Sequence, residues 1–129
     1  MIDAKKRILI VDDTDDITTG LKLYLEKAGP YEVRVEREGA KAVATAREFR
    51  PDLILMDMVM PDVGGDEVAA QLSADPACQQ MPVVFLTAAA SLNESGSRGE
   101  EIDGKRVLSK LTPLSDVVKY IKQTLEPQE

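Results

Sequence analysis

Histidine is absent from the 129 residues, and several kinds of chemistry are absent with it. A Ser-His-Asp triad needs imidazole as its general base, and most zinc hydrolase sites need it as a ligand. Neither kind of site can be built from this chain. Any mechanism that needs a histidine of these 129 residues as base, nucleophile or metal ligand is therefore excluded.

Cysteine and long apolar segments are scarce as well. Cys78 is the only cysteine, so no internal disulfide can form, as fits a reducing compartment, and we expect its thiol to be inert. No apolar run reaches the roughly 18 residues of a membrane span. The basic start is followed only by the short run Ile8–Val11, which is too short for the core of a signal peptide. We therefore expect a cytoplasmic protein with no membrane partner.

Positive charge is in deficit, with 16 basic residues against 23 acidic ones and a net charge of −7. This balance disfavours direct binding of nucleic acid or of an anionic bilayer. The chain does have 43% hydrophobic residues, enough for a packed core in a domain of ordinary size. We expect residues 1–129 to form a single domain.

Short runs rich in Ile, Val and Leu alternate with segments of helical spacing. Runs that are apolar on both faces are typical of buried strands in a parallel sheet. The expected strands are Ile8–Val11, Val33–Val35, Leu53–Met56, Val83–Leu86 and Val107–Leu108. The expected inward helical residues are Ile17, Leu21, Tyr24, Leu25 and Ala28; Ala42, Val43, Ala46 and Phe49; Val68 and Leu72; and Leu114, Val117, Val118, Ile121 and Leu125.

Turn and cap residues punctuate these helices. Gly29-Pro30 should end the first, and Arg50-Pro51 the second. Thr112 should cap the last helix, with Pro113 in its first position.

This alternation predicts an α/β fold, a doubly wound five-stranded parallel sheet with right-handed crossovers and helices on both faces. One connection breaks the pattern, because residues 91–105 contain three glycines and three serines. The fourth helix, expected there, should be weak or irregular. Ligands of such sheets bind at the carboxyl ends of the strands.

Three carboxylates are predicted to meet at that edge. Asp12 and Asp13 follow the first apolar run, and Asp57 follows the third. Like charges about 4 Å apart repel by ~4 kcal/mol per pair at an effective dielectric of 20, so such a cluster raises its pKa values or binds a cation. Hard oxygen ligands favour Mg²⁺ or Mn²⁺. Alone, the Asp pair could equally be a helix cap.

A hydroxyl and an ammonium are predicted at the same edge. Thr87 follows the fourth run, and Lys110 follows the fifth. Alone, Thr87 is more often a turn residue and Lys110 a solvated charge. Together with three carboxylates they suit transfer of a phosphoryl group to Asp57, with a cation and Lys110 neutralising the phosphoryl oxygens.

Four segments in this order carry a family resemblance: ILIVDDTDD, PDLILMDMVMPDVGGDEV, PVVFLTA and VLSK. The chain resembles the receiver domains of response regulators in two-component phosphorelay systems, of the chemotaxis-regulator kind. The resemblance implies a flavodoxin-like fold with strand order 2-1-3-4-5. It implies an aspartyl phosphoprotein that catalyses only its own phosphorylation and dephosphorylation, without turnover of a substrate.

The resemblance also implies residue roles. Asp57 would be the phosphoacceptor and also a ligand of Mg²⁺, which would be bound directly by Asp13, largely through water by Asp12, and by the Val59 carbonyl. Lys110 and Thr87 would contact the phosphoryl oxygens. Met60-Pro61 and Gly64-Gly65 would shape the loop after the acceptor.

The implied phosphodonor is the phosphohistidine of a histidine kinase or a histidine phosphotransfer protein. Thr18, Thr19 and Lys22, on the outer side of the first helix, would belong to the docking face. The downstream target is not identified by the sequence.

Two positions and one segment depart from the family pattern. Leu111 stands where a cis-proline usually follows the lysine, and a cis bond before a non-proline costs about 2.5–4 kcal/mol. Val107 replaces an aromatic residue whose ring reports phosphorylation. The Gly/Ser-rich segment 91–104 suggests signalling by ordering of that segment, or simply a tolerant surface loop.

Two rival functions remain open from the residues. Asp13-Thr14-Asp15 begins the D-x-D motif of aspartate-nucleophile phosphatases, but Ile17 stands where Thr or Val should be. A pseudo-receiver that binds a partner without phosphorylation is the other alternative. Mg²⁺-dependent phosphorylation separates this interaction module from a receiver.

Overall fold

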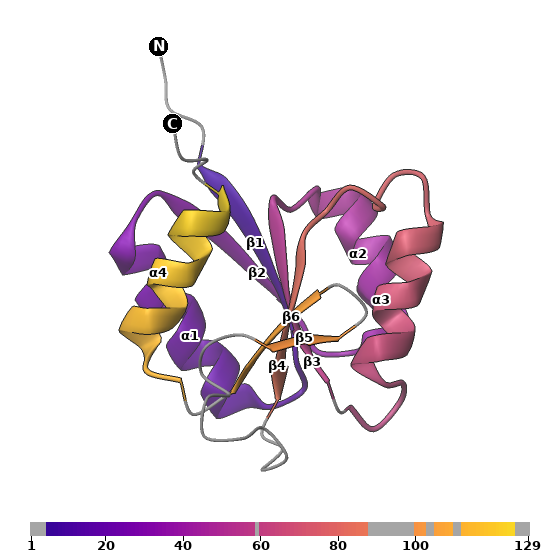
Figure 1. Ribbon diagram of the computed structural model, residues 1–129, viewed down its shortest axis with the longest axis horizontal. Helices are drawn as coiled ribbons and strands as arrows, with labels where there is room; N and C mark the ends of the chain where they lie inside the picture. The colour runs from indigo at the N-terminus through magenta and orange to yellow at the C-terminus, as the bar shows by residue number, and fades with distance from the viewer. Residues whose placement is uncertain (1–4, 59, 88–99, 103–104, 110–111, 126–129) are drawn as a thin grey trace.

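The computed structural model describes residues 5–58, 60–87, 100–102, 105–109 and 112–125. It has three layers, with a twisted sheet between two pairs of helices (Figure 1). The strands are β1 (Lys6–Val11), β2 (Tyr31–Glu36), β3 (Leu53–Asp57), β4 (Val83–Thr87), β5 (Glu100–Ile102) and β6 (Lys105–Ser109). The helices are α1 (Asp15–Ala28), the short 3-10 helix η1 (Gly39–Lys41), α2 (Ala42–Phe49), α3 (Gly65–Ala74) and α4 (Leu114–Leu125).

The sheet has the predicted parallel core and one additional strand. Its order is β2-β1-β3-β4-β6-β5, in which the first five strands pair in parallel. In sequence order these five are the predicted 2-1-3-4-5 arrangement, which is confirmed. The antiparallel pairing of β5 with β6 was not predicted. Most of segment 91–104 lies outside the described residues, and β5 is its described part.

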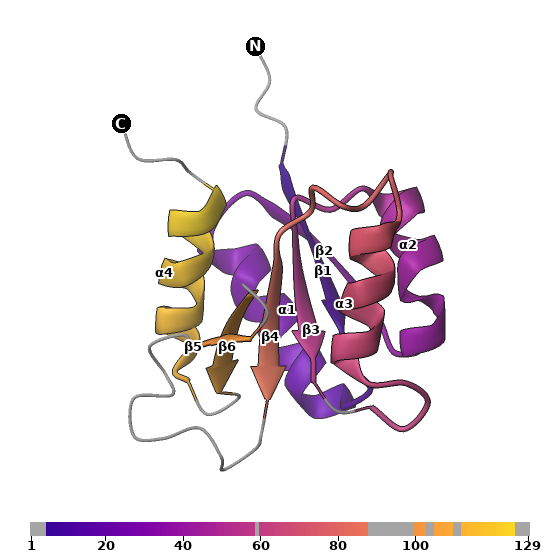
Figure 2. The same cartoon turned by 45° about the vertical axis from the view of Figure 1, so that its right-hand side comes forward.

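Alternation along the strands supplies two cores, one on each face. On one face, Ile8 and Ile10 of β1 pack in a cluster that includes residues of α1 and α4. On the other, Leu9 and Val11 pack with residues of α2 and α3. Both views show the helices paired in this way (Figures 1 and 2). The sheet is therefore buried on both sides, as its apolar runs predict.

Two predicted helix ends are confirmed, and one predicted cap is wrong. Helix α1 ends before Gly29, and α2 ends at Phe49, before Arg50, which adopts a left-handed conformation with φ of 56°. Helix α4 begins at Leu114, and the Pro113 carbonyl accepts hydrogen bonds from Asp116 and Val117. Thr112 does not cap it, because its buried Oγ1 has no hydrogen-bond partner among the described residues.

The inward stripe of α1 differs from the predicted one. Thr18, Leu21 and Leu25 are buried, whereas Tyr24 is 37% exposed. Thr18, Leu21 and Leu25 are spaced three and four residues apart, so they form one line along the buried face of the helix. Tyr24 lies to the side of this line. The prediction was therefore wrong for Tyr24, and also for Leu114 of α4, which is 39% exposed.

Within the part of the chain that the structure describes, no helix combines the length and apolarity needed to cross a membrane.

Candidate functional site

The three predicted carboxylates meet where β1 and β3 end. Val11 pairs with Met56 in the parallel register, so Asp12 and Asp57 follow at the same level of neighbouring strands. Asp12, Asp13 and Asp57 each have one carboxylate oxygen that lies within 4.8 Å of the corresponding oxygens of the other two. The carboxyl ends of β3 and β4 point towards this edge of the sheet (Figure 2). The prediction that these side chains converge is confirmed.

Burial differs among the three acids. Asp12 and Asp57 are 1% and 4% exposed, whereas Asp13 is exposed. The Oδ1 atom of Asp12 accepts a hydrogen bond of 2.9 Å from the Thr14 amide, which fixes the turn that leads into α1. The cluster therefore has a buried floor and an open side at Asp13, through which a small hydrated ligand can enter.

The chemistry of this oxygen set fits a divalent cation. Two or three carboxylates without nitrogen or sulfur ligands suit Mg²⁺ or Mn²⁺, which retain several waters when bound to proteins. A cation also offsets the mutual repulsion of three negative charges at this separation. Asp12, Asp13 and Asp57 are the residues that would hold it.

The backbone brings Thr87 to the same edge. It is the last residue of β4, and it pairs with Ser109, the last residue of β6. Lys110 comes directly after Ser109 in the sequence, but it lies outside the described residues, as do Val59 and Leu111. The isomer of the Lys110–Leu111 bond is therefore outside the description as well.

Gly65 holds the loop that follows Asp57 tightly against the sheet. Its amide donates to the Met58 carbonyl at 2.9 Å, and the Met58 amide donates to the Leu86 carbonyl at 3.0 Å. A Cβ atom at Gly65 would lie 2.1 Å from the Asp57 carbonyl oxygen, closer than any real contact. Only a glycine at position 65 permits α3 to approach β3 this closely. This agrees with the expectation that Gly65 helps to shape the loop after the acceptor.

Asp62 anchors the far part of the same loop, a role that was not predicted from the sequence. Its Oδ2 accepts a 2.9 Å hydrogen bond from the Ala40 amide of η1, and its Oδ1 accepts one of 3.0 Å from Val63. The bond from Ala40 is the main reason that the pKa of Asp62 lies below its usual range. An aspartate directly after Pro61 is a typical turn former, which was the available clue.

The predicted docking residues of α1 do not share one face. Thr18 is 1% exposed, so its placement on the outer side was wrong. It lies three residues before Leu21, on the line of buried side chains that faces the sheet. Thr19 is exposed and Lys22 is half-buried, pairing with Glu26 at 3.1 Å.

Val107 and Cys78 are both core residues. Val107 is 1% exposed and packs in the cluster shared with α2 and α3, so no aromatic ring occupies this position. Cys78 is also buried, and burial raises the pKa of its thiol. The buried position of Cys78 and the raised pKa of its thiol fit the expectation that this thiol is inert.

Comparisons with known proteins agree with this geometry. DivK of Brucella anthropi, a polar-differentiation response regulator, is 41% identical over 87 residues, which are 66% of this chain and 68% of DivK. Protein PilH of Pseudomonas aeruginosa is 41% identical over 81 residues, 63% of this chain and 66% of PilH. The aligned part is 68% of the length of DivK, but only 25% of the length of the longer regulator PleD of Caulobacter vibrioides.

A solved structure has the same fold over nearly the whole chain. The receiver domain of the sensor histidine kinase PA1611 from Pseudomonas aeruginosa PAO1 superposes with a TM-score of 0.80 at 25% identity, covering 96% of this chain and 100% of that one. That structure holds a magnesium ion in its active-site cleft. The family model of the response regulator receiver domain matches residues 8–122. The chain therefore belongs to the response regulator receiver domain family of two-component signalling.

Proposed function

We propose that Asp57 is the phosphoacceptor of this receiver and that Mg²⁺ is its cofactor. The observation that carries the proposal is the buried Asp57 carboxylate in a cluster with Asp12 and Asp13, at the carboxyl edge of the sheet. The magnesium-bound receiver domain of PA1611 supports the choice of metal. No feature of the described residues favours a pseudo-receiver, and the family match favours a receiver over a phosphatase.

In the proposed reaction a carboxylate oxygen of Asp57 attacks the phosphorus of a phosphohistidine on a kinase or phosphotransfer protein. The new P–O bond forms as the P–N bond breaks, and the imidazole nitrogen keeps the bonding electrons and takes up a proton. Asp12, Asp13, Asp57 and the Val59 carbonyl would hold Mg²⁺, which would supply charge neutralisation at the phosphoryl oxygens. Lys110 would add a second positive charge, and the Thr87 hydroxyl would donate to a phosphoryl oxygen.

The kind of phosphodonor follows from this chemistry. Because these 129 residues contain no histidine, the phosphohistidine donor must lie outside them. We propose a single cytoplasmic receiver domain that performs only its own phosphorylation and dephosphorylation. Its signal would pass to a protein target by a change of conformation, without direct contact with nucleic acid.

Intact-mass spectrometry after incubation with acetyl phosphate and Mg²⁺ tests the proposal. We expect one added phosphoryl group in the wild type, none in Asp57→Asn, and none when Mg²⁺ is removed with EDTA. Asp116→Asn is the matched control, because Asp116 is an exposed acid in the first turn of α4. An adduct that survives in Asp57→Asn would refute the assignment of the acceptor.

A further inference from the structure

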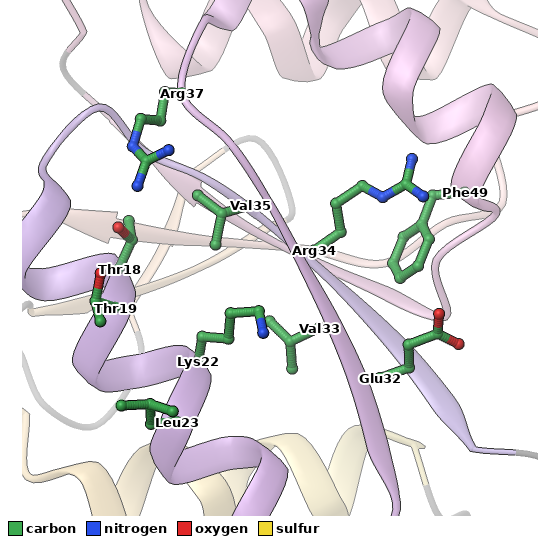
Figure 3. A pocket seen from close by; sticks show the side chains of 10 residues that line it. All are labelled: Thr18, Thr19, Lys22, Leu23, Glu32, Val33, Arg34, Val35, Arg37 and Phe49. Carbon is green, nitrogen blue, oxygen red and sulfur yellow. The ribbon is translucent and has the colours of Figure 1, made fainter.

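The outer edge of the sheet at β2 offers a surface that the proposed phosphorylation site does not use. Among the described strands β2 has one neighbour, β1, so its other side is open. A groove of about 480 Å³ runs along this edge, with walls that include Thr19, Lys22 and Leu23 of α1 on one side and Arg34 and Phe49 on the other (Figure 3). The edge is therefore accessible to another strand.

The hydrogen-bond pattern shows which backbone groups of β2 point outwards. The carbonyls of Pro30 and Glu36, at the two ends of β2, accept hydrogen bonds from the amides of Lys6 and Asp12. The even-numbered residues of β2 therefore point their amides and carbonyls towards β1. In a parallel pair, alternate residues point their amide and carbonyl to opposite sides. The amides and carbonyls of Val33 and Val35 thus point to the open edge, ready to pair with a further strand.

The charges on β2 select the partner. Glu32 and Arg34 flank Val33, and their side chains are 51% and 44% exposed. In an antiparallel pair of two β2 strands centred on Val33, Glu32 of each copy lies opposite Arg34 of the other. Opposite charges in directly facing positions stabilise strand pairs. The strand is therefore self-complementary in charge about Val33.

Each of these charges already has an exposed partner within the chain. Glu32 lies 3.4 Å from Arg7, and Arg34 lies 3.7 Å from Glu48. Exposed ion pairs of this kind contribute little stability, so their rearrangement does not oppose pairing strongly. Arg34 also stacks over the Phe49 ring at 4.8 Å, which holds its guanidinium beside the edge.

An exposed apolar side chain lies beside the same edge. Leu23 of α1 is 54% exposed and lines the groove. A two-fold axis perpendicular to the joined sheet keeps both α1 helices on the same side of it, which brings Leu23 towards its counterpart. We propose that this edge binds a second copy of the chain, with the two β2 strands antiparallel about Val33.

Sedimentation equilibrium of the phosphate-free and metal-free chain tests the pairing independently of phosphorylation. We expect a concentration-dependent dimer that Glu32→Arg weakens roughly tenfold or more, because two attractive pairs become two repulsive ones. Glu67→Arg, which makes the same charge change on the exposed surface of α3, should leave dimerisation unchanged. A wild type that remains monomeric up to about 0.5 mM would overturn the proposal and would mean that these charges shield the edge or serve another partner.

Disulfide trapping tests the register. In the proposed pair, positions 32 and 34 of opposite copies form a non-hydrogen-bonded pair with Cα atoms about 4.5 Å apart, within the range that a disulfide bridges. A mixture of Glu32→Cys and Arg34→Cys should therefore cross-link faster under mild oxidation than either variant alone. Circular dichroism confirms that each variant is folded. Equal rates for the mixture and the single variants would contradict the register.

Discussion

Gly65 and Asp57 are in backbone contact, since a Cβ atom on Gly65 would lie 2.1 Å from the Asp57 carbonyl oxygen. The N-terminus of α3 is thereby placed directly on the end of β3 that carries the proposed acceptor. This contact is backbone against backbone, so no side-chain movement can relieve an added methyl group. It makes the fold of the loop and the position of Asp57 depend on the same residue.

Gly65→Ala should therefore destabilise the protein. We expect a loss of about 1–3 kcal/mol in the free energy of unfolding, the usual range for overpacking, together with slower phosphorylation by acetyl phosphate. Urea denaturation and intact-mass time courses measure the two effects. Gly20→Ala is the control, because a Cβ at this exposed helical position meets nothing within 4 Å and should stabilise the helix by up to roughly 1 kcal/mol. Equal stability of Gly65→Ala and wild type would contradict the contact.

Asp13→Asn should separate charge repulsion from metal binding. In EDTA, the substitution removes one of three clustered negative charges. It should stabilise the folded state by about 1 kcal/mol at the dielectric of water, and so raise the melting temperature slightly. In Mg²⁺ the wild type should gain stability that the variant largely lacks, because a ligand that binds only the folded state stabilises it. Differential scanning calorimetry in both buffers measures these shifts. An equal Mg²⁺ response in both proteins would rule out Asp13 as a ligand.

Arg47 and Asp75 form a hydrogen-bonded ion pair that links α2 to the end of α3. We expect this pair to stabilise the fold at pH values where Asp75 is ionised. Arg47 Nε donates to Asp75 Oδ2 at 2.8 Å, and the hydrogen bond from Arg47 is the main cause of the lowered pKa of the Asp75 carboxyl. A lowered folded-state pKa gives stability that is present above the unfolded value of about 3.8 and is lost as pH falls through the lower folded value.

Arg47→Ala should accordingly lower the melting temperature at pH 7, and the difference from wild type should shrink as the pH falls below about 4. Thermal melts between pH 7 and pH 2.5 measure this dependence. Glu48→Ala is the matched control, since Glu48 is the next residue of α2, is 76% exposed and lies 3.7 Å from Arg34, a long ion pair. A difference for Arg47→Ala that stays constant over this pH range would show that the pair makes no electrostatic contribution.

Asp62→Ala should loosen the loop after the acceptor without removing any site carboxylate. It deletes the acceptor of the Ala40 amide bond that fastens this loop to η1. We expect faster hydrogen exchange at Ala40 and Val63 and slower phosphorylation, with Asp57 still the only acceptor. Asp66→Ala, a nearby exposed acid in the first turn of α3, serves as the control. Unchanged exchange at Ala40 would show that Asp62 does not hold the loop.

The parallel core of the fold could be read from the sequence because its strands are buried on both faces. Runs such as Leu53–Met56 have no polar residue to mark a solvent side, and the structure buries every residue of β3. The strand β5 could not be predicted in this way. Glu100 and Glu101 form two of its three residues, and only pairing with β6 makes the segment a strand.

The carboxylate cluster was predictable because parallel strands deliver their carboxyl ends to one edge. The hydrogen bonds that hold the surrounding loops were not, because Asp62 and Ala40 are 22 residues apart and nothing local pairs them. Thr18 shows a different limit. A threonine is compatible with either face of a helix, so only packing against the sheet decides that it is buried.

The most direct test of the central claim is to locate the phosphoryl group in the chain. Treatment of the phosphorylated protein with borohydride reduces an aspartyl phosphate to homoserine, which peptide sequencing by tandem mass spectrometry places at a single residue. We predict homoserine at position 57 alone, and only in samples that were phosphorylated in the presence of Mg²⁺. Homoserine at Asp12, at Asp13 or at any other position, with Asp57 unmodified, would contradict the account.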